Sequence, residues 1–97
     1  MITHSVLFTW KQDMPQGQVD TIIAGLSKLP AMVPSIRDYR FGPDLGISPG
    51  TSDFAVVATF DDVDGWRAYD RNEFHDSVRA NDIVPWTASR TVIQFES

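Results

Sequence analysis

The stretch FAVVATF, residues 54–60, is apolar at both its odd and its even positions, with one threonine as the exception. Successive side chains of a strand point to opposite faces, so a strand with one face in water alternates apolar and polar residues. Both faces of this strand are therefore expected to be buried. In a chain of 97 residues the helices cover only one face of such a sheet, and we expect a second copy to cover the other, making a homodimer.

Three more strands and two helical regions are expected around this stretch. The strands are expected at residues 2–10, 36–41 and 89–95. Apolar residues that return every three or four positions from Val19 to Leu29 predict a helix, with Pro15 in its first turn and Pro30 at its end. Two shorter helical pieces are expected at 63–71 and 74–80.

The resulting order, β-α-β-β-α-β, is typical of the ferredoxin-like α+β fold. Its four-stranded antiparallel sheet carries the helices on one face. We interpret residues 1–97 as a single domain, because a chain of this length has room for one core.

The composition excludes several classes of partner and cofactor. Acidic residues outnumber basic ones by 13 to 8, giving a net charge of −5, and the basic residues form no cluster. Nucleic acids and membranes are therefore not expected as partners. With no cysteine and two histidines, neither a disulfide nor a metal site is expected. The chain also lacks a long apolar run and a leader-like start, which favours a cytoplasmic location.

Two polar segments receive structural interpretations. Asp61, Asp62 and Asp64 lie between a strand and a helix, where carboxylates favour the helix N-terminus more often than they bind a metal. The glycine-rich segment 42–52 lacks the spacing of a phosphate-binding loop, so we interpret it as a connection.

Five stretches together resemble the stress-responsive A/B-barrel family. They are ITHSVLFTWK (2–11), LPAMVPSI (29–36), YRFGPDL (39–45), SDFAVVATF (52–60) and YDRNEFH (69–75). Members of this family are dimers of ferredoxin-like subunits, so the resemblance implies a dimeric α+β barrel. The family includes stress-induced proteins without established catalysis and a plant polyketide cyclase.

The resemblance to that cyclase implies a site made of His4, Tyr69 and His75. The cyclase has a histidine near the start of its first strand and, after its third strand, a tyrosine followed six residues later by a histidine. His75 would be the general base, Tyr69 would donate a hydrogen bond to an enolate oxygen, and His4 would orient the substrate. The family commonly has His-Pro where this chain has Asn72 and Glu73.

The chemistry of these side chains fits such a site, although each residue taken alone also has an ordinary structural explanation. Imidazole accepts a proton near neutral pH, and a phenol donates to a developing oxyanion. The implied reaction is proton abstraction next to a carbonyl, followed by aldol or Claisen ring closure without a cofactor. Candidate walls for a small hydrophobic or aromatic ligand, which plain core packing would explain equally well, are Phe8, Val56, Trp66, Val84 and Trp86.

Two other functions remain open. The first is a non-enzymatic stress-responsive or interaction protein with a filled interior. The second is an antibiotic-biosynthesis-type monooxygenase, which has a related dimeric barrel and would consume oxygen. Convergence of His4, Tyr69 and His75 on one cavity would favour the cyclase-type enzyme over the interaction protein.

Overall fold

The computed structural model describes residues 1–97. The strands and helices follow one another in the order β1 (Ile2–Trp10), α1 (Gln18–Ser27), α2 (Leu29–Met32), β2 (Ile36–Pro43), β3 (Phe54–Phe60), α3 (Val63–Asp70), α4 (Glu73–Val78), the π-helical turn η1 (Arg79–Ile83), the 3-10 turn η2 (Val84–Trp86) and β4 (Thr87–Glu96). The expected α+β order is confirmed.

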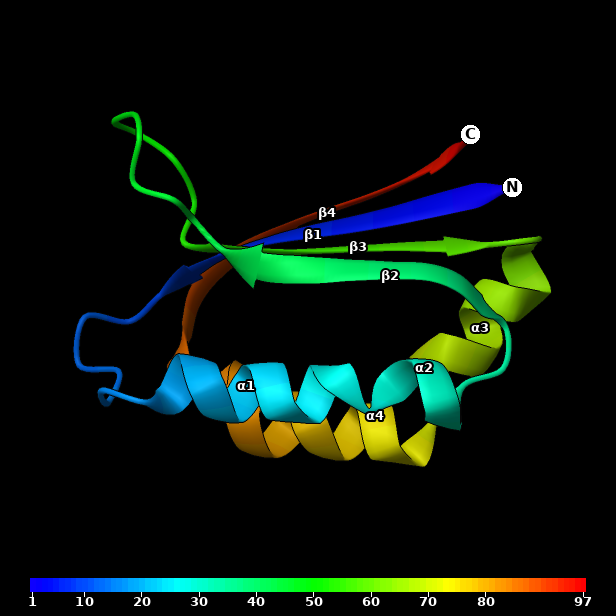
Figure 1. Cartoon of the computed structure of the whole chain (residues 1–97), viewed down its shortest axis with the longest axis horizontal. Helices are drawn as coiled ribbons and strands as arrows, with labels where there is room; N and C mark the ends of the chain where they lie inside the picture. The colour runs from blue at the N-terminus through cyan, green and yellow to red at the C-terminus, as the bar shows by residue number, and fades with distance from the viewer.

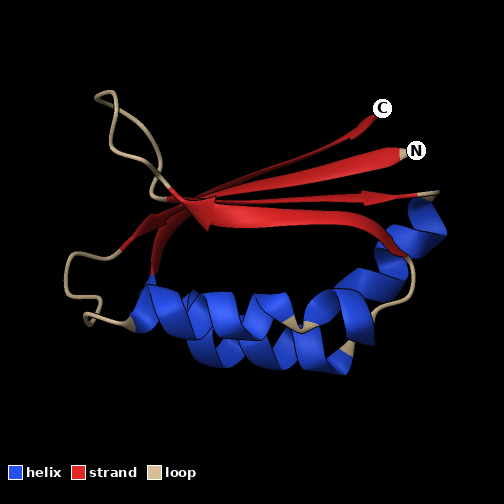
Figure 2. Cartoon of the chain, in the orientation of Figure 1, coloured by secondary structure: helices blue, strands red, loops and turns tan.

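The four strands form one antiparallel sheet in the order β2-β3-β1-β4. All helices lie on one face of this sheet, as Figures 1 and 2 show. Val6 of β1 lies opposite Val56 of β3 and Val92 of β4, which sets the register across the centre of the sheet. None of the helices has the length and hydropathy of a membrane-spanning segment.

The core lies between the helices and the sheet face that carries the even-numbered residues of β1 and β3. Phe54, Val56, Ala58 and Phe60 are all buried there. Buried side chains of α1 and α2, among them Ile22, pack onto this face. This half of the prediction for residues 54–60 is confirmed.

The other face of the sheet is open in a single chain. Ala55, Val57 and Thr59 of β3 are only half-buried there. Leu7 of β1 and Ile93 of β4 are 43% and 57% exposed, and the register places them on this same face. The loop between β2 and β3 rises on this side, away from the helices (Figure 1).

Two of the expected helix boundaries are wrong. Pro15 precedes α1, because the helix begins at Gln18 after Gly17, whose φ of 90° suits a residue without a side chain. Pro30 does not end a helix but lies in the first turn of α2, where a missing N–H breaks no hydrogen bond. The break between α1 and α2 falls at Lys28.

The last helical region and the last strand are both longer than expected. The chain continues from α4 through η1 and η2 without an extended segment, and β4 then begins at Thr87 rather than Ser89. Because π-helical turns often occur at functional sites, the position of η1 beside the cavity described below is relevant to function.

Candidate functional site

A cavity of about 100 Å³ lies between the covered face of the sheet and the helices α3 and α4. His4 from β1, Tyr69 from α3 and His75 from α4 all line it, together with seven other hydrophobic residues among its 14 lining residues. The three residues singled out in the sequence therefore converge on one cavity. A cavity of roughly 150 Å³ is known to accommodate benzene, so this one has room for a small reacting group.

His75 is positioned by the N-cap of α4 and by the stacking of its ring on Tyr69. Asn72 is the N-cap of α4, and its Oδ1 accepts a hydrogen bond from the His75 backbone N–H at 3.0 Å. Asn72 and Glu73 thus start the helix in place of the family's histidine and proline. The His75 ring stacks on the ring of Tyr69, with centroids 3.9 Å apart.

The hydrogen bond of the His75 ring determines its tautomer. Nδ1 lies 2.9 Å from the backbone oxygen of Tyr69. A carbonyl oxygen only accepts, so Nδ1 carries the proton and Nε2 of the neutral ring holds a free lone pair. No group of the chain forms a hydrogen bond with Nε2. This nitrogen is also not fully buried, because the one fully buried side-chain nitrogen or oxygen without a partner is Trp66 Nε1.

His75 is neutral at physiological pH. The side chain is 5% exposed, and this burial lowers its pKa to about 4. The hydrogen bond to the Tyr69 carbonyl and the carboxylates of Asp70 and Asp76 act in the opposite direction without overcoming it. The ring therefore offers an unprotonated Nε2 over the whole physiological pH range.

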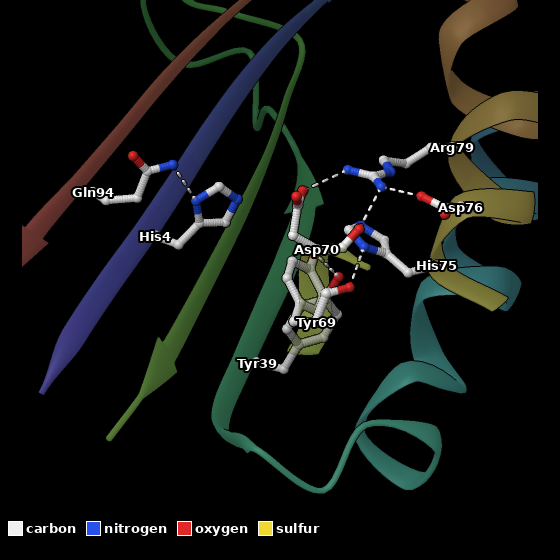
Figure 3. Close-up of polar contacts among 8 residues, drawn as sticks. All are labelled: His4, Tyr39, Tyr69, Asp70, His75, Asp76, Arg79 and Gln94. Carbon is white, nitrogen blue, oxygen red and sulfur yellow. Dashed lines mark hydrogen bonds and ion pairs between the residues drawn. The ribbon is translucent and has the colours of Figure 1, made fainter. Parts of the chain in front are cut away.

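His4 has the opposite tautomer. Its Nδ1 lies 2.9 Å from the amide nitrogen of Gln94, the residue opposite it on β4 (Figure 3). An amide nitrogen only donates, so Nδ1 accepts and Nε2 carries the proton. Burial lowers the pKa of His4; the carboxylate of Asp70 opposes this effect, and the charges of Arg90 and Arg79 add to it. The neutral ring thus offers an N–H donor at Nε2.

Tyr69 forms a pair with Tyr39 of β2. Their hydroxyl oxygens are 2.9 Å apart, and burial raises the pKa of both phenols. Tyr39 does not line the cavity. The hydroxyl of Tyr69 is therefore directed to a partner outside the cavity, while its ring supports His75 from one side.

Two arginines reach the cavity in different states. Arg79, on η1, donates to the carboxylate of Asp70 at 3.0 Å, to the backbone oxygen of Asp70 at 2.7 Å and to the carboxylate of Asp76 (Figure 3). Arg90, on β4, makes no ion pair. Asp70 and Asp76 both pair with Arg79, so Arg90 is the guanidinium at the cavity that has no ion-pair partner.

Three of the five expected cavity walls line the cavity: Phe8, Val56 and Trp66. Val84 and Trp86 do not. Both lie in η2, where the chain turns from the helical layer to β4, and Val84 faces a neighbouring hollow.

Polar residues at the cavity that the sequence analysis missed are Asp70, Arg79, Arg90 and Gln94. Gln94 could have been found from the strand register, because it lies opposite His4. The direction of the two arginines depends on packing that no local pattern encodes.

The carboxylates after β3 are structural. Asp62 is the N-cap of α3 and accepts a hydrogen bond from the Gly65 N–H at 2.8 Å, and Asp61 pairs with Arg37. No group of three or more histidine, aspartate and glutamate side chains is arranged to hold a metal ion.

The family model described as Stress responsive A/B Barrel Domain matches residues 2–97. A dimeric ferredoxin-like protein of unknown function from Thermobifida fusca is 44% identical, over 99% of this chain and 90% of that chain, with a TM-score of 0.92. No protein of curated function matches the sequence.

Two more distant structures share the fold. A hydroxynitrile lyase from Passiflora edulis is 22% identical over 97% of this chain and 90% of that chain, with a TM-score of 0.81. A Nitrosomonas europaea protein, provisionally named an antibiotic biosynthesis monooxygenase, is 13% identical over 100% of this chain and 98% of that chain, with a TM-score of 0.80.

Proposed function

The chain belongs to the stress responsive A/B barrel domain family, and we propose that its cavity carries a cofactor-independent site for proton abstraction next to a carbonyl group. The observation that carries this proposal is the pair of neutral histidines with opposite tautomers on one cavity. His75 offers a lone pair and His4 offers an N–H. A base and a hydrogen-bond donor are the two groups that enolate formation requires.

The reaction would begin with Nε2 of His75 taking a proton from the carbon next to the carbonyl. The electron pair of the broken C–H bond forms a C=C bond, and the carbonyl π pair moves to oxygen to give an enolate. The enolate carbon then attacks a second carbonyl carbon of the same molecule, forming a C–C bond. The new alkoxide takes the proton back from the imidazolium, so the atoms and electrons balance.

His4 is the better placed donor for the enolate oxygen. Tyr69 has the role of donor in the sequence-based hypothesis, but its hydroxyl is hydrogen-bonded to Tyr39. The Nε2–H of His4 has no partner in the chain. Because a base with a pKa of about 4 has a low proton affinity, the carbon acid also needs a donor at its carbonyl oxygen. In this proposal Tyr69 positions His75 by stacking.

The test is deuterium exchange into a simple ketone, methyl 4-oxopentanoate, followed by proton NMR in D₂O. We expect exchange next to the ketone above the buffer rate, with a rate that stays level from pH 8 to about 5 because His75 remains unprotonated. Exchange at the buffer rate, or a midpoint near the unperturbed value of about 6.5, would contradict the proposal.

Other outcomes would favour the other two functions. A folded dimer that promotes no exchange would favour the interaction protein. Oxygen consumption with a phenolic substrate would favour a monooxygenase. The fold is compatible with lyase chemistry, since the Passiflora edulis protein is a hydroxynitrile lyase.

We also propose that residues 1–97 form one domain that pairs with a second copy through the open face of the sheet. Leu7 and Ile93 are exposed on this face, and an apolar sheet face of this kind is rarely left in water. The Thermobifida fusca protein, 44% identical, is described as dimeric. Leu45 and Ile47, both exposed in the loop that rises on the same side, would contact the second copy.

A further inference from the structure

A second hollow of about 260 Å³ adjoins the histidine cavity. The two share four lining residues, which are Phe8, Arg79, Ile83 and Arg90. Together their volumes reach the range of small-molecule sites, roughly 300–1,000 Å³. A ligand longer than the inner cavity could therefore extend past these residues into the outer hollow, where Val84 and Thr87 form the wall.

Arg90 stands at the junction of the two hollows. It lies opposite Phe8 in the strand register, so it shares the helix-covered side of the sheet. Its guanidinium forms neither an ion pair nor a hydrogen bond within the chain, whereas Arg79 beside it is held by Asp70 and Asp76. Arg90 is thus the one guanidinium at this junction with all its donors free for a ligand.

The one unpaired guanidinium at the junction fits a monoanion. Asp70 and Asp76 pair with Arg79, so the guanidinium of Arg90 is the cation at this junction without an ion-pair partner, next to two neutral histidines. A planar carboxylate matches both the charge and the forked donor geometry of a guanidinium. A phosphate dianion would instead bring a second negative charge close to Asp70. Arg90 is exposed to solvent, and Lys11, Lys28 and Arg71 also lack ion pairs, but Arg90 is the one cation of these four that lines the two hollows.

We propose that the substrate is a small keto acid whose carboxylate binds Arg90, whose body lies in the outer hollow, and whose ketone enters the histidine cavity. This inference rests on the proposed function for the role of His75, whereas the carboxylate site is inferred from Arg90 and the two hollows alone. Arg90 would then determine specificity and orientation, because it fixes one end of the ligand while His75 acts at the other.

The test compares 4-oxopentanoate with its methyl ester, two ligands that differ in charge at one end. Binding is measured by calorimetry for the wild type, Arg90→Gln and Arg90→Lys. We expect the wild type to bind the acid more tightly than the ester. Arg90→Gln should weaken binding of the acid by about 10- to 100-fold, as expected for a charge-assisted hydrogen bond, and leave the ester unchanged. Arg90→Lys should restore part of the loss.

Two further variants separate the outcomes. Arg71→Gln removes the same charge from an exposed position outside both hollows and should leave binding of the acid unchanged. His75→Asn should still bind the acid but fail to exchange deuterium. If this variant binds the acid and also exchanges deuterium at the wild-type rate, that result contradicts the general-base role alone and leaves the Arg90 site standing. Equal binding of acid and ester by the wild type, or equal weakening by Arg71→Gln and Arg90→Gln, would overturn the Arg90 site.

Discussion

Replacing His75 by asparagine is expected to reduce deuterium exchange into methyl 4-oxopentanoate by about 10²-fold or more, the usual contribution of a general base. Asparagine keeps an N–H donor close to the position of Nδ1, so the hydrogen bond to the Tyr69 carbonyl is retained. The variant loses only the Nε2 lone pair. The rate is measured by NMR at a single pH near 7, where wild-type His75 is neutral.

Ser77→Ala is the matched control for this variant. Ser77 lies on the same helix, is exposed, and bonds only to the backbone oxygen of Phe74. We expect it to exchange at the wild-type rate. Thermal unfolding of both variants shows whether each is folded in the assay. A folded His75→Asn protein with a rate within about threefold of the wild type would fall well short of the expected effect and remove His75 from the mechanism.

Replacing Ile93 by aspartate is expected to convert the dimer to monomers at micromolar concentration. Ile93 lies on the open face of the sheet, opposite Ser5 of β1. Each copy would lose the burial of an isoleucine side chain, about 2 kcal/mol, and would also desolvate a carboxylate, which costs several kcal/mol more. Because both copies carry the change, we expect the dissociation constant to rise by more than about 10³-fold. Sedimentation velocity measures the result.

Met32→Asp is the control for the dimer experiment. Met32, on α2, is 49% exposed, close to the 57% of Ile93, but it lies in the helical layer rather than on the open face. The same substitution there should leave a dimer. If both variants sediment as the wild type does, or if the wild type is itself a monomer, the open face is not the interface.

The strands were predictable because their signals are local. The alternation over residues 2–10 predicts the observed bounds of β1, and the two-sided apolarity over residues 54–60 predicts those of β3. The end of the first helix was predicted wrongly at Pro30, because a proline can follow the end of one helix or lie in the first turn of the next. Only the break at Lys28, which the structure shows, distinguishes these two positions. Local patterns thus predict the elements better than their boundaries.

The site was predictable in part. His4, Tyr69 and His75 meet at one cavity, which the resemblance to a known family implied. The chemistry of the site depends on contacts between distant segments, such as Gln94 with His4, 90 residues apart, and Tyr39 with Tyr69, 30 residues apart. These contacts determine tautomers and hydroxyl direction, and a single sequence carries no local sign of them.

The most direct measurement of the central claim is a two-bond ¹H–¹⁵N NMR spectrum of the two histidine rings, titrated with pH. The chain has only His4 and His75, so His4→Gln assigns both. We predict that near pH 7 His75 shows the Nδ1–H pattern and His4 the Nε2–H pattern, and that His75 titrates at about 4. Two rings of the same tautomer, or a His75 ring that titrates near the ordinary value of about 6.5, would contradict the account of a base and a donor on one cavity.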